Sequence, residues 1–215
     1  MIKAVIFDMD GTMLDTDKLW GDVNSKLATS CGVVFDEIVH RQMIGKKDDD
    51  CLLAFKEYFH LDIEVEELIR MRRKMVLEDV GLVQKKEGLY ELLDLLDKLS
   101  IKKAVATSAF GEFAHRIISS LNLEKRFDTI LVGEDVTKGK PDPEIFLKAA
   151  ERLNVDPSEC LVLEDAENGV LSAHRANIKV FVIPHPSFKD HDFSKATKVL
   201  SSMLEIDEAM LKSLN

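Results

Sequence analysis

Two pairs of acidic residues lie far apart in the sequence, and each pair directly follows a short apolar run. Asp8 and Asp10 form the first pair, and Glu164 and Asp165 form the second. Carboxylate oxygens are hard ligands that bind Mg²⁺ well. A carboxylate can also attack phosphorus and form an acyl phosphate. The two pairs therefore indicate phosphoryl transfer at a magnesium site.

Two hydroxyl groups and a lysine add the complementary chemistry. Thr107 and Ser108 follow another apolar run, and Lys140 lies in the polar segment GKPDP. A hydroxyl and an ammonium group can hold the oxygens of a phosphoryl group during its transfer. Four carboxylates outweigh Lys140 and one Mg²⁺, so either one carboxyl group is protonated or further donors help. Asp10 is the favoured candidate, because a leaving alkoxide needs an acid.

Five short apolar runs are predicted to form buried strands. Between them, apolar residues recur at spacings of three and four, which predicts amphipathic helices. The alternation of strand and helix favours an α/β fold with a Rossmann-like doubly wound parallel sheet. The predicted strands span 2–7, 103–107, 129–132, 160–163 and 179–183, and the predicted helices span 89–99, 113–121, 143–153 and 168–176.

The chemically active residues lie where these strands end. In an open α/β sheet, ligands bind beyond the carboxyl ends of the strands, near the point where the strand order reverses. Each residue alone would be explained as a turn former, a helix cap or a solvated cation. Together they are expected to meet at one edge of the sheet. The set comprises Asp8, Asp10, Thr107, Ser108, Lys140, Glu164 and Asp165.

Residues 16–81 interrupt the alternation of strands and helices. This segment contains no convincing strand, and its amphipathic stretches predict helices near 19–28, 50–59 and 65–77. We expect an inserted helical domain whose return linker contains Gly81 and residues 84–88. The predicted domains are a catalytic core of residues 1–15 and 82–215 and a helical domain of residues 16–81.

The composition limits the partners of the chain. Its formal net charge is −10, so no general attraction to nucleic acid or to an anionic membrane is expected. The three cysteines form no CxxC pair, which argues against a disulfide framework and against a zinc site. The apolar run at the N-terminus is too short for a signal peptide or a membrane span. We expect a cytoplasmic monomer that acts on a small molecule.

The motifs at the strand ends resemble the four signature motifs of the haloacid dehalogenase superfamily. In the order of that family, they are DMDGT at 8–12, the strand end at Thr107, GKPDP at 139–143 and LED at 163–165. One such motif alone would be weak, whereas four in order are specific. The inserted helical segment is similar to the family's cap domain. The resemblance implies a phosphatase with a helical cap that uses Mg²⁺.

The resemblance implies a role for each residue of the first motif. Asp8 would be the nucleophile and a metal ligand. Asp10 would be the general acid for the leaving group and then the base that activates water, and its backbone carbonyl would also bind Mg²⁺. Gly11 would let the loop bend, and Thr12 would orient the Asp10 carboxylate.

The later motifs would hold the phosphoryl group and the metal. Thr107 and Lys140 would bind the phosphoryl oxygens, with Ser108 beside them as a further substrate-binding residue. Asp165 would complete the protein ligands to Mg²⁺, and Glu164 would be either a ligand or a residue that orients one. The set implies hydrolysis of a phosphomonoester through an aspartyl-phosphate intermediate.

Cap residues bear on the choice of substrate. Lys46 and Lys47 could contact the part of the substrate that is not transferred, or could be ordinary solvated lysines. The acidic run 48–50 could form a second metal site, but a solvated turn that caps a helix is favoured. Together with the core motifs, the segment 45–47 resembles phosphatases of sugar phosphates and of pseudouridine 5'-phosphate. A sugar phosphate or a nucleoside phosphate is therefore the expected substrate.

A phosphosugar mutase is the main alternative, because β-phosphoglucomutases resemble this chain along most of its length. They carry a histidine at the position of Trp20 and a cap arginine at the position of Asp48. These differences favour water as the acceptor of the phosphoryl group. A non-catalytic relative that binds a phosphorylated metabolite is a third possibility, and the intact set of carboxylates argues against it.

Overall fold

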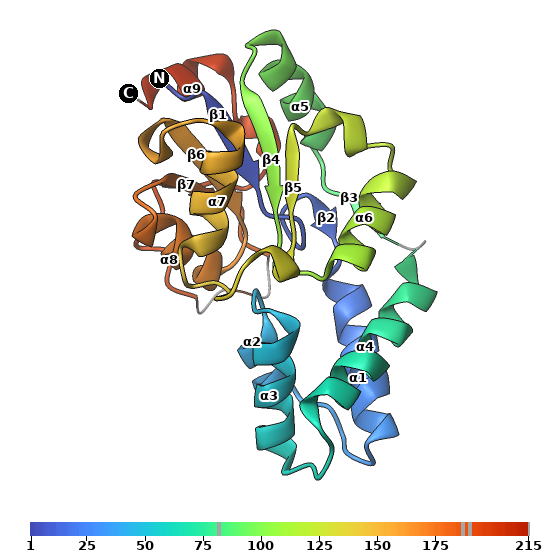
Figure 1. The fold of residues 1–215 in the computed structure, drawn as a ribbon. Coiled ribbons are helices and arrows are strands. Elements are labelled where there is room, and N and C mark those ends of the chain that lie inside the picture. The colour runs from blue at the N-terminus through green and yellow to red at the C-terminus, as the bar shows by residue number, and fades with distance from the viewer. Residues whose placement is uncertain (81–82, 186–187, 189–190, 215) are drawn as a thin grey trace.

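In the described part of the chain, a six-stranded parallel sheet forms the centre of the protein (Figure 1). The computed structural model describes residues 1–80, 83–185, 188 and 191–214. The strand order is β5-β4-β1-β6-β7-β8, so the order reverses at the central strand β1. The strands are β1 Ala4–Phe7, β4 Lys102–Ala106, β5 Thr129–Leu131, β6 Cys160–Glu164, β7 Lys179–Val182 and β8 Lys198–Val199.

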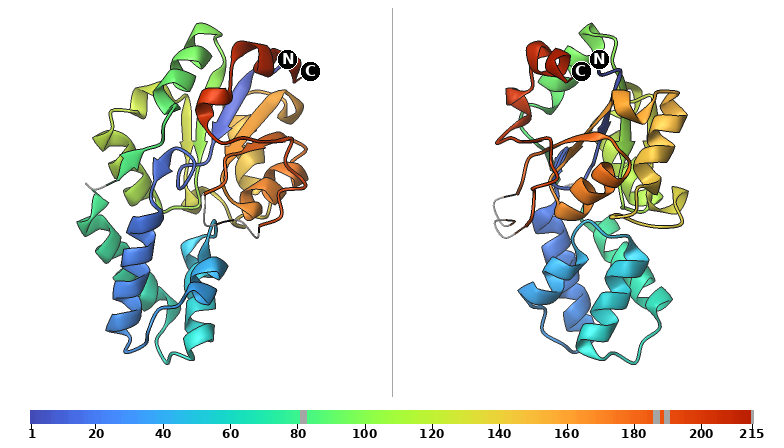
Figure 2. Two further views of the ribbon diagram at one scale, coloured as in Figure 1. Left: turned by 180° about the vertical axis from the view of Figure 1, so that it is seen from behind. Right: turned by 90° about the vertical axis from the view of Figure 1, so that its left-hand side faces the viewer.

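Helices cover both faces of the sheet (Figures 1 and 2). Val5 and Phe7 belong to the apolar cluster under α5 and α6, whereas Ala4 and Ile6 belong to the cluster under α7 and α8. Because both faces are covered, the strand is apolar at every position. The helices are α5 Leu89–Lys98, α6 Gly111–Ser120, α7 Glu144–Leu153, α8 Glu167–Arg175 and α9 Glu208–Ser213, with 3₁₀ helices η2 Glu124–Arg126, η3 Gly133–Asp135, η4 Pro157–Glu159 and η5 Met203–Glu205.

A helical cap region lies beyond one end of the sheet (Figure 1). Its helices pack around a separate apolar cluster that includes Leu27, Leu52 and Phe55. Two short strands, β2 Leu14–Asp15 and β3 Gln84–Lys85, pair antiparallel where the chain leaves the core and returns to it. The cap helices are α1 Asp17–Ser30, α2 Glu37–Met43, α3 Asp48–Phe59 and α4 Val65–Glu78.

The structure confirms the predicted fold class, and the predicted core strands and helices end within two residues of the observed ones. The sequence pattern missed β8, α2, α9, the 3₁₀ helices and the pair of β2 and β3, and part of the expected linker 84–88 is strand β3. Elements of two residues are too short to show a hydrophobic period. Gly81 and the predicted domain boundary between residues 81 and 82 lie outside the described residues, so the domain limits remain a prediction.

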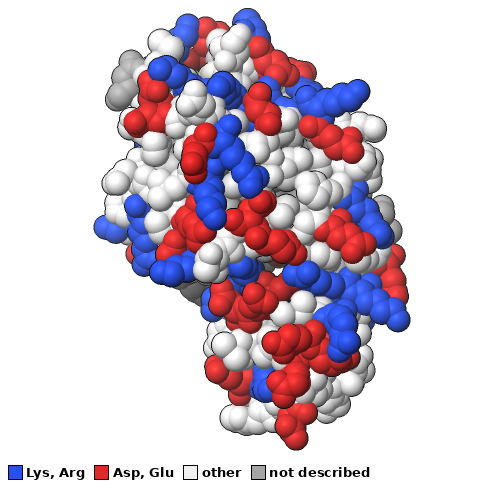
Figure 3. All heavy atoms as spheres, in the orientation of Figure 1, with Lys and Arg blue, Asp and Glu red and all other residues white. Residues whose placement is uncertain are grey.

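The lengths of the helices and the distribution of surface charge bear on whether the protein could bind a membrane or nucleic acid. No helix in the described ranges combines the length and the apolar content that crossing a membrane requires. On the face drawn in Figure 3, Lys and Arg side chains are mixed with Asp and Glu side chains. The described residues of that face therefore form no continuous basic surface of the kind that attracts nucleic acid.

Candidate active site

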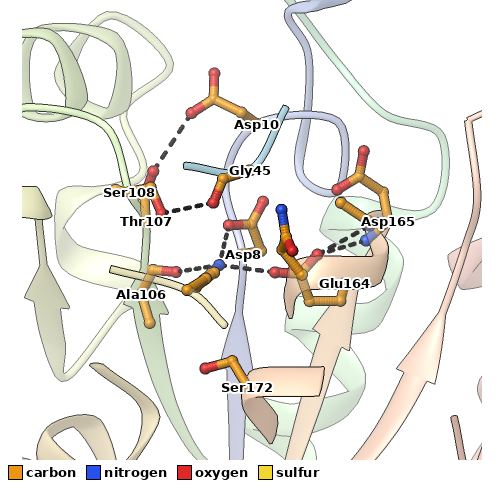
Figure 4. Close-up of polar contacts among 12 residues, drawn as sticks. Asp8, Asp10, Gly45, Ala106, Thr107, Ser108, Glu164, Asp165 and Ser172 are labelled. Atoms are coloured by element: carbon orange, nitrogen blue, oxygen red, sulfur yellow. Dashed lines mark hydrogen bonds and ion pairs between the residues drawn. The ribbon is translucent and has the colours of Figure 1, made fainter. Parts of the chain in front are cut away.

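A buried lysine joins two carboxylates. These carboxylates, Asp8 and Glu164, lie at the carboxyl ends of β1 and β6 (Figure 4). Lys140 Nζ lies 2.6 Å from Asp8 Oδ1 and 2.7 Å from Glu164 Oε1. It also donates to the carbonyl oxygen of Ala106 at 3.2 Å. The three charged side chains are buried. The fold thus brings together residues of the first, third and fourth motifs.

Burial and charge act in opposite directions on this cluster. Burial raises the pKa of Asp8 to about 8, although Lys140 opposes the rise. Burial alone would lower the pKa of Lys140, but the charges of Asp8 and Glu164 outweigh burial and raise it. Lys140 is therefore charged, yet one ammonium group does not balance the neighbouring carboxylates. A further cation would favour the ionised form of Asp8.

Asp8, Glu164 and Asp165 form a buried acidic group that could hold a metal ion. One carboxylate oxygen of each residue lies within 4.8 Å of the other two. Burial, together with the charges of Glu164 and Asp8, raises the pKa of Asp165 well above its ordinary value. A divalent cation would relieve this cost by stabilising the ionised carboxylates. Oxygen donors of this type fit Mg²⁺.

Backbone groups and glycines fix the two acidic residues of the fourth motif. Glu164 Oε2 accepts hydrogen bonds from the backbone N–H groups of Asp165 at 2.9 Å and Ala166 at 3.0 Å. A Cβ atom on Gly169 would overlap the Glu164 carboxylate. A Cβ atom on Gly11, whose φ is +79°, would overlap the Asp165 carboxylate, so the expected bend at Gly11 is present. Both Glu164 oxygens already have partners, which favours an orienting role.

Asp10 belongs to a separate network at the same end of the sheet. Its carboxyl group accepts hydrogen bonds from Trp20 Nε1 at 2.7 Å, from Thr107 Oγ1 at 3.3 Å and from Thr16. Burial raises the pKa of Asp10, and these hydrogen bonds offset the rise only in part. A raised pKa suits a group that must deliver a proton. The prediction for Thr12 is wrong: among the described residues its buried Oγ1 has no hydrogen-bond partner, and Thr16 and Trp20 orient Asp10 instead.

A cap loop closes over the strand ends. Ser108 Oγ, expected to bind substrate, donates to the Gly45 carbonyl at 3.1 Å. Asn168 Nδ2, from α8 in the core, donates to the Ile44 carbonyl at 3.2 Å. The cap therefore rests on the core through hydrogen bonds on both sides of the loop.

The two lysines of this loop have different surroundings. Lys47 Nζ donates to the Val136 carbonyl at 2.8 Å, so it ties the cap to the core. Lys46 lines the cavity between cap and core, and its ammonium group makes no hydrogen bond or ion pair with another described residue. Of the two lysines expected to bind substrate, the structure places Lys46 at the cavity and Lys47 beside it.

The cavity gathers most of the predicted site residues. Lys140 does not line the cavity. Its ammonium group contacts Asp8, which does line it, and so acts on the site by holding the Asp8 carboxylate. The core residues that line the cavity are Asp8, Asp10, Gly11, Thr107, Ser108, Glu164 and Asp165, and the cap residues include Trp20, Asn24, Met43, Lys46, Cys51 and Arg72.

Sequence reasoning missed a buried charge cluster in the cap. Asp48 accepts hydrogen bonds from Arg72 Nη1 and Arg73 Nε, both at 2.7 Å. Arg72 Nε also donates to Asn24 Oδ1 at 2.9 Å, and Arg73 pairs with Glu134 of the core at 3.2 Å. Asp48 is therefore a buried ion-pair partner and not a solvated turn residue. Two adjacent arginines in a predicted amphipathic helix are the sequence signal that could have indicated it.

Glu144 holds the loop that leads to Lys140. Its carboxylate accepts hydrogen bonds from Lys148 Nζ at 2.7 Å and from the backbone N–H groups of Lys138 at 2.9 Å and Thr137 at 3.1 Å. These contacts, the Lys148 bond first, lower the pKa of Glu144 from 4.5 to about 2. Ionised Glu144 therefore stabilises the fold above pH 4.5, and this contribution is lost as the pH falls toward 2.

Substitution of Glu144 by glutamine is expected to lower the melting temperature at neutral pH. The loss should shrink as the pH falls below 4.5, because the wild-type carboxylate then loses its own contribution. Thermal unfolding followed by circular dichroism at neutral pH and at about pH 3.5 measures both effects. Glu151→Gln, an exposed change on the same helix, is the control. Equal losses at both pH values would contradict the assignment.

Comparison with known proteins agrees with this geometry. Residues 5–183 match the family described as haloacid dehalogenase-like hydrolase, a range that includes the cap and all four motifs. The phosphorylated carbohydrates phosphatase of Thermotoga maritima is 35% identical over 188 residues, which cover 86% of each chain. The protein named "Probable pseudouridine-5'-phosphatase" of Drosophila melanogaster is 29% identical, over 95% of this chain and 91% of its own.

A solved structure shows the same fold. The crystal structure of β-phosphoglucomutase from Clostridium difficile superposes with a TM-score of 0.89 at 23% identity, and the match covers 100% of this chain and 97% of that one. The family match and the relatives confirm the resemblance that the four motifs indicated. The chain belongs to the haloacid dehalogenase-like hydrolase family and is a phosphatase of that family.

Proposed function

We propose that this phosphatase hydrolyses phosphomonoesters of small metabolites through a phosphoryl group carried covalently by Asp8. The observation that carries the proposal is the placement of Asp8. It lines the cavity, its Oδ1 is held by a buried lysine, and the carboxyl group of Asp10 lines the same cavity. A nucleophile and a separately held acid at one cavity are the two groups that an acyl-phosphate mechanism needs.

Asp8 and Asp165 are the proposed side-chain ligands of Mg²⁺, with the Asp10 backbone carbonyl. Glu164 holds their geometry, because its oxygens accept hydrogen bonds from Lys140 and from the Asp165 backbone N–H. The buried surplus of carboxylate charge fits a divalent cation. When bound, Mg²⁺ would neutralise charge on the phosphoryl oxygens and favour the ionised nucleophile.

In the first step, an oxygen of Asp8 forms a bond to phosphorus while the ester P–O bond breaks. Lys140 holds Asp8 Oδ1 in place, and the Thr107 hydroxyl at the cavity can hold a phosphoryl oxygen. Protonated Asp10 gives its proton to the leaving oxygen, so the product departs as an alcohol. Asp10 is then a carboxylate.

In the second step, the Asp10 carboxylate takes a proton from water while the water oxygen attacks phosphorus. The bond between phosphorus and Asp8 breaks, and inorganic phosphate leaves. Asp8 returns as a carboxylate and Asp10 as an acid, so both residues are ready for another turnover. The cap contacts at Gly45 and Ile44 would exclude other water during the reaction.

A sugar phosphate or a nucleoside phosphate is the proposed substrate, in line with the names of the two relatives. Lys46 is the proposed contact to the part that is not transferred, because its ammonium group is free of other described partners at the cavity. We place Lys47 in cap closure rather than in substrate binding. The proposed setting is the cytoplasm, and the proposed state is a monomer.

Water is the proposed acceptor rather than a second sugar hydroxyl. Trp20 stands where mutases carry histidine. Asp48 stands at the position of their cap arginine and forms ion pairs with Arg72 and Arg73. The cap therefore presents no cation at that position. Conversion of β-glucose 1-phosphate to the 6-phosphate that exceeds phosphate release would overturn this choice.

Release of phosphate is expected to require Mg²⁺. A panel of sugar phosphates, nucleotides and pseudouridine 5'-phosphate would be incubated with Mg²⁺, with EDTA, and with EDTA followed by excess Mg²⁺. We expect turnover of at least one ester with Mg²⁺, loss with EDTA and recovery on adding the metal back. Equal phosphate release in EDTA, after exhaustive dialysis, would contradict the metal assignment.

A further inference from the structure

The Trp20 side chain, on helix α1 of the cap, makes a direct hydrogen bond to a proposed catalytic group. Its indole N–H donates to Asp10 Oδ1 at 2.7 Å. The indole belongs to α1 of the cap, whereas Asp10 follows β1 of the core. An indole nitrogen can donate a hydrogen bond but cannot accept one. Asp10 Oδ1 must therefore be an acceptor in every protonation state that keeps this contact.

The indole is held firmly from both the cap and the core. The Arg72 guanidinium lies 4.3 Å from the centre of the Trp20 ring, and the Phe113 ring centre lies 5.1 Å from it. Arg72 is itself fixed, because it donates to Asn24 at 2.9 Å and to Asp48 at 2.7 Å. A guanidinium with these partners has little freedom to leave the ring. The buried charge cluster of the cap thus supports the position of Trp20.

This contact decides which oxygen of Asp10 can carry a proton. The indole at Oδ1 can only donate, whereas the Thr107 hydroxyl at Oδ2 can donate to the ionised carboxylate or accept from the protonated carboxyl group. A protonated Asp10 must therefore carry its hydrogen on Oδ2. Asp10 Oδ2 lies 3.3 Å from the Thr107 hydroxyl, which lines the cavity (Figure 4). The hydrogen is therefore placed on the side of the carboxyl group that faces the proposed phosphoryl-binding hydroxyl.

We propose that Trp20 is a positioning residue that orients the Asp10 carboxyl group so that Oδ2 delivers the proton to the leaving oxygen. The inference rests on the proposed acid role of Asp10. The hydrogen bond from Trp20 thereby connects the position of the cap to proton transfer by Asp10. Because the indole comes from the cap, the acid is aligned only when α1 and Asp10 are in contact, and cap closure thereby completes the proton-delivery geometry.

The test is the dependence of the Trp20→Phe effect on the leaving group. Phenylalanine keeps an aromatic ring next to Phe113 and Arg72 but removes the N–H donor. The ratio kcat/KM reports steps up to departure of the leaving group. A sugar phosphate needs a proton on its leaving oxygen, whereas p-nitrophenolate leaves without one. We expect kcat/KM to fall about 10- to 100-fold for the best sugar phosphate and less than about 3-fold for p-nitrophenyl phosphate.

Tyr58→Phe is the matched control. It also removes a hydrogen bond from an aromatic side chain of the cap to a carboxylate, Asp36, but Tyr58 does not line the cavity. It should leave both kcat/KM values unchanged. A Trp20→Phe variant that loses the same factor on both substrates would show general damage and overturn the inference.

Asp10→Asn separates this inference from the proposed function. If Asp10→Asn shows the leaving-group dependence and Trp20→Phe does not, the Trp20 inference fails while the acid role stands. If Asp10→Asn lowers the two kcat/KM values equally, the acid role itself fails, and the inference with it.

A spectroscopic measurement keeps the inference testable if Trp20→Phe does not fold. Trp20 is the single tryptophan of the chain, so one indole N–H signal is expected in the ¹H–¹⁵N NMR spectrum. A hydrogen bond to a carboxyl oxygen shifts that signal downfield. We expect Asp10→Ala to move it upfield and Tyr58→Phe to leave it in place. A signal that Asp10→Ala does not move would overturn the inference.

Discussion

Replacement of Asp8 by asparagine is expected to lower kcat on the order of 10⁴-fold or more, because an amide cannot form the acyl phosphate. The fold should survive the change. Burial disfavours the charge of Asp8, and Lys140 keeps Glu164 as a partner at 2.7 Å. Steady-state phosphate release measures the loss, and circular dichroism with a thermal melt verifies the fold.

Asp62→Asn is the control for this prediction, since Asp62 is an exposed aspartate in the cap. A covalent readout sharpens the test. Acid quenching of wild-type enzyme with ³²P-labelled substrate should trap label on the protein that hydroxylamine releases, as an acyl phosphate requires. The Asp8→Asn protein should trap none. An Asp8→Asn variant with near wild-type turnover would exclude Asp8 as the nucleophile.

The second large effect is expected for Asp10→Asn. Without the acid, kcat/KM for a sugar phosphate should fall about 10²- to 10⁴-fold, while p-nitrophenyl phosphate should be affected much less. Without the base, water attack should also slow. Phosphoenzyme formed from p-nitrophenyl phosphate should therefore accumulate in Asp10→Asn to a higher level than in the wild type, as measured by acid quenching.

Asp15→Asn provides the comparison, because Asp15 is exposed and lies five residues further along the same segment. It should change neither the leaving-group dependence nor the level of trapped phosphoenzyme. An Asp10→Asn protein that forms phosphoenzyme normally and also releases phosphate normally would assign the acid and base steps to another residue.

The core fold could be predicted because its elements carry strong periodic signals. The run that became β1 is apolar at every position, since helices cover both faces of a parallel sheet. The helices α5, α6, α7 and α8 show their apolar faces as spacings of three and four. The pair β2 and β3 and the strand β8 span two residues each, so no period exists to detect. These short strands form only because a partner strand lies beside them, and the sequence pattern does not show which segment that partner is.

The proposed catalytic residues could be predicted from the sequence because most of them follow predicted strands. The carboxyl ends of parallel strands meet at one edge of a sheet, so residues that follow the strands converge whatever their distance along the chain. Asp8 and Lys140 are 132 positions apart and yet lie 2.6 Å from each other. Residue type and strand end were therefore enough to bring Asp8 and Glu164 together, whereas Lys140, in the loop between β5 and α7, was assigned from the GKPDP motif.

The cap required the tertiary structure, because its contacts depend on how helices pack and not on strand ends. Lys46 and Lys47 are adjacent in sequence, yet one lines the cavity and the other binds the Val136 carbonyl. Asp48 looked like a helix cap and is instead neutralised by two arginines of α4. Sequence spacing does not fix which face of one helix meets which face of another.

The sequence by itself determined the sheet, the order of the four motifs and the carboxylate chemistry at the strand ends. Only the tertiary structure decided how the acid is held: Trp20 and Thr16 bind Asp10, whereas Thr12 does not. The physical reason is that the fold class fixes where strands end but does not fix individual short contacts between domains. Strand-end convergence is imposed by the fold class, but hydrogen bonds of a few ångströms between core and cap depend on where α1 lies relative to the loop that follows β1.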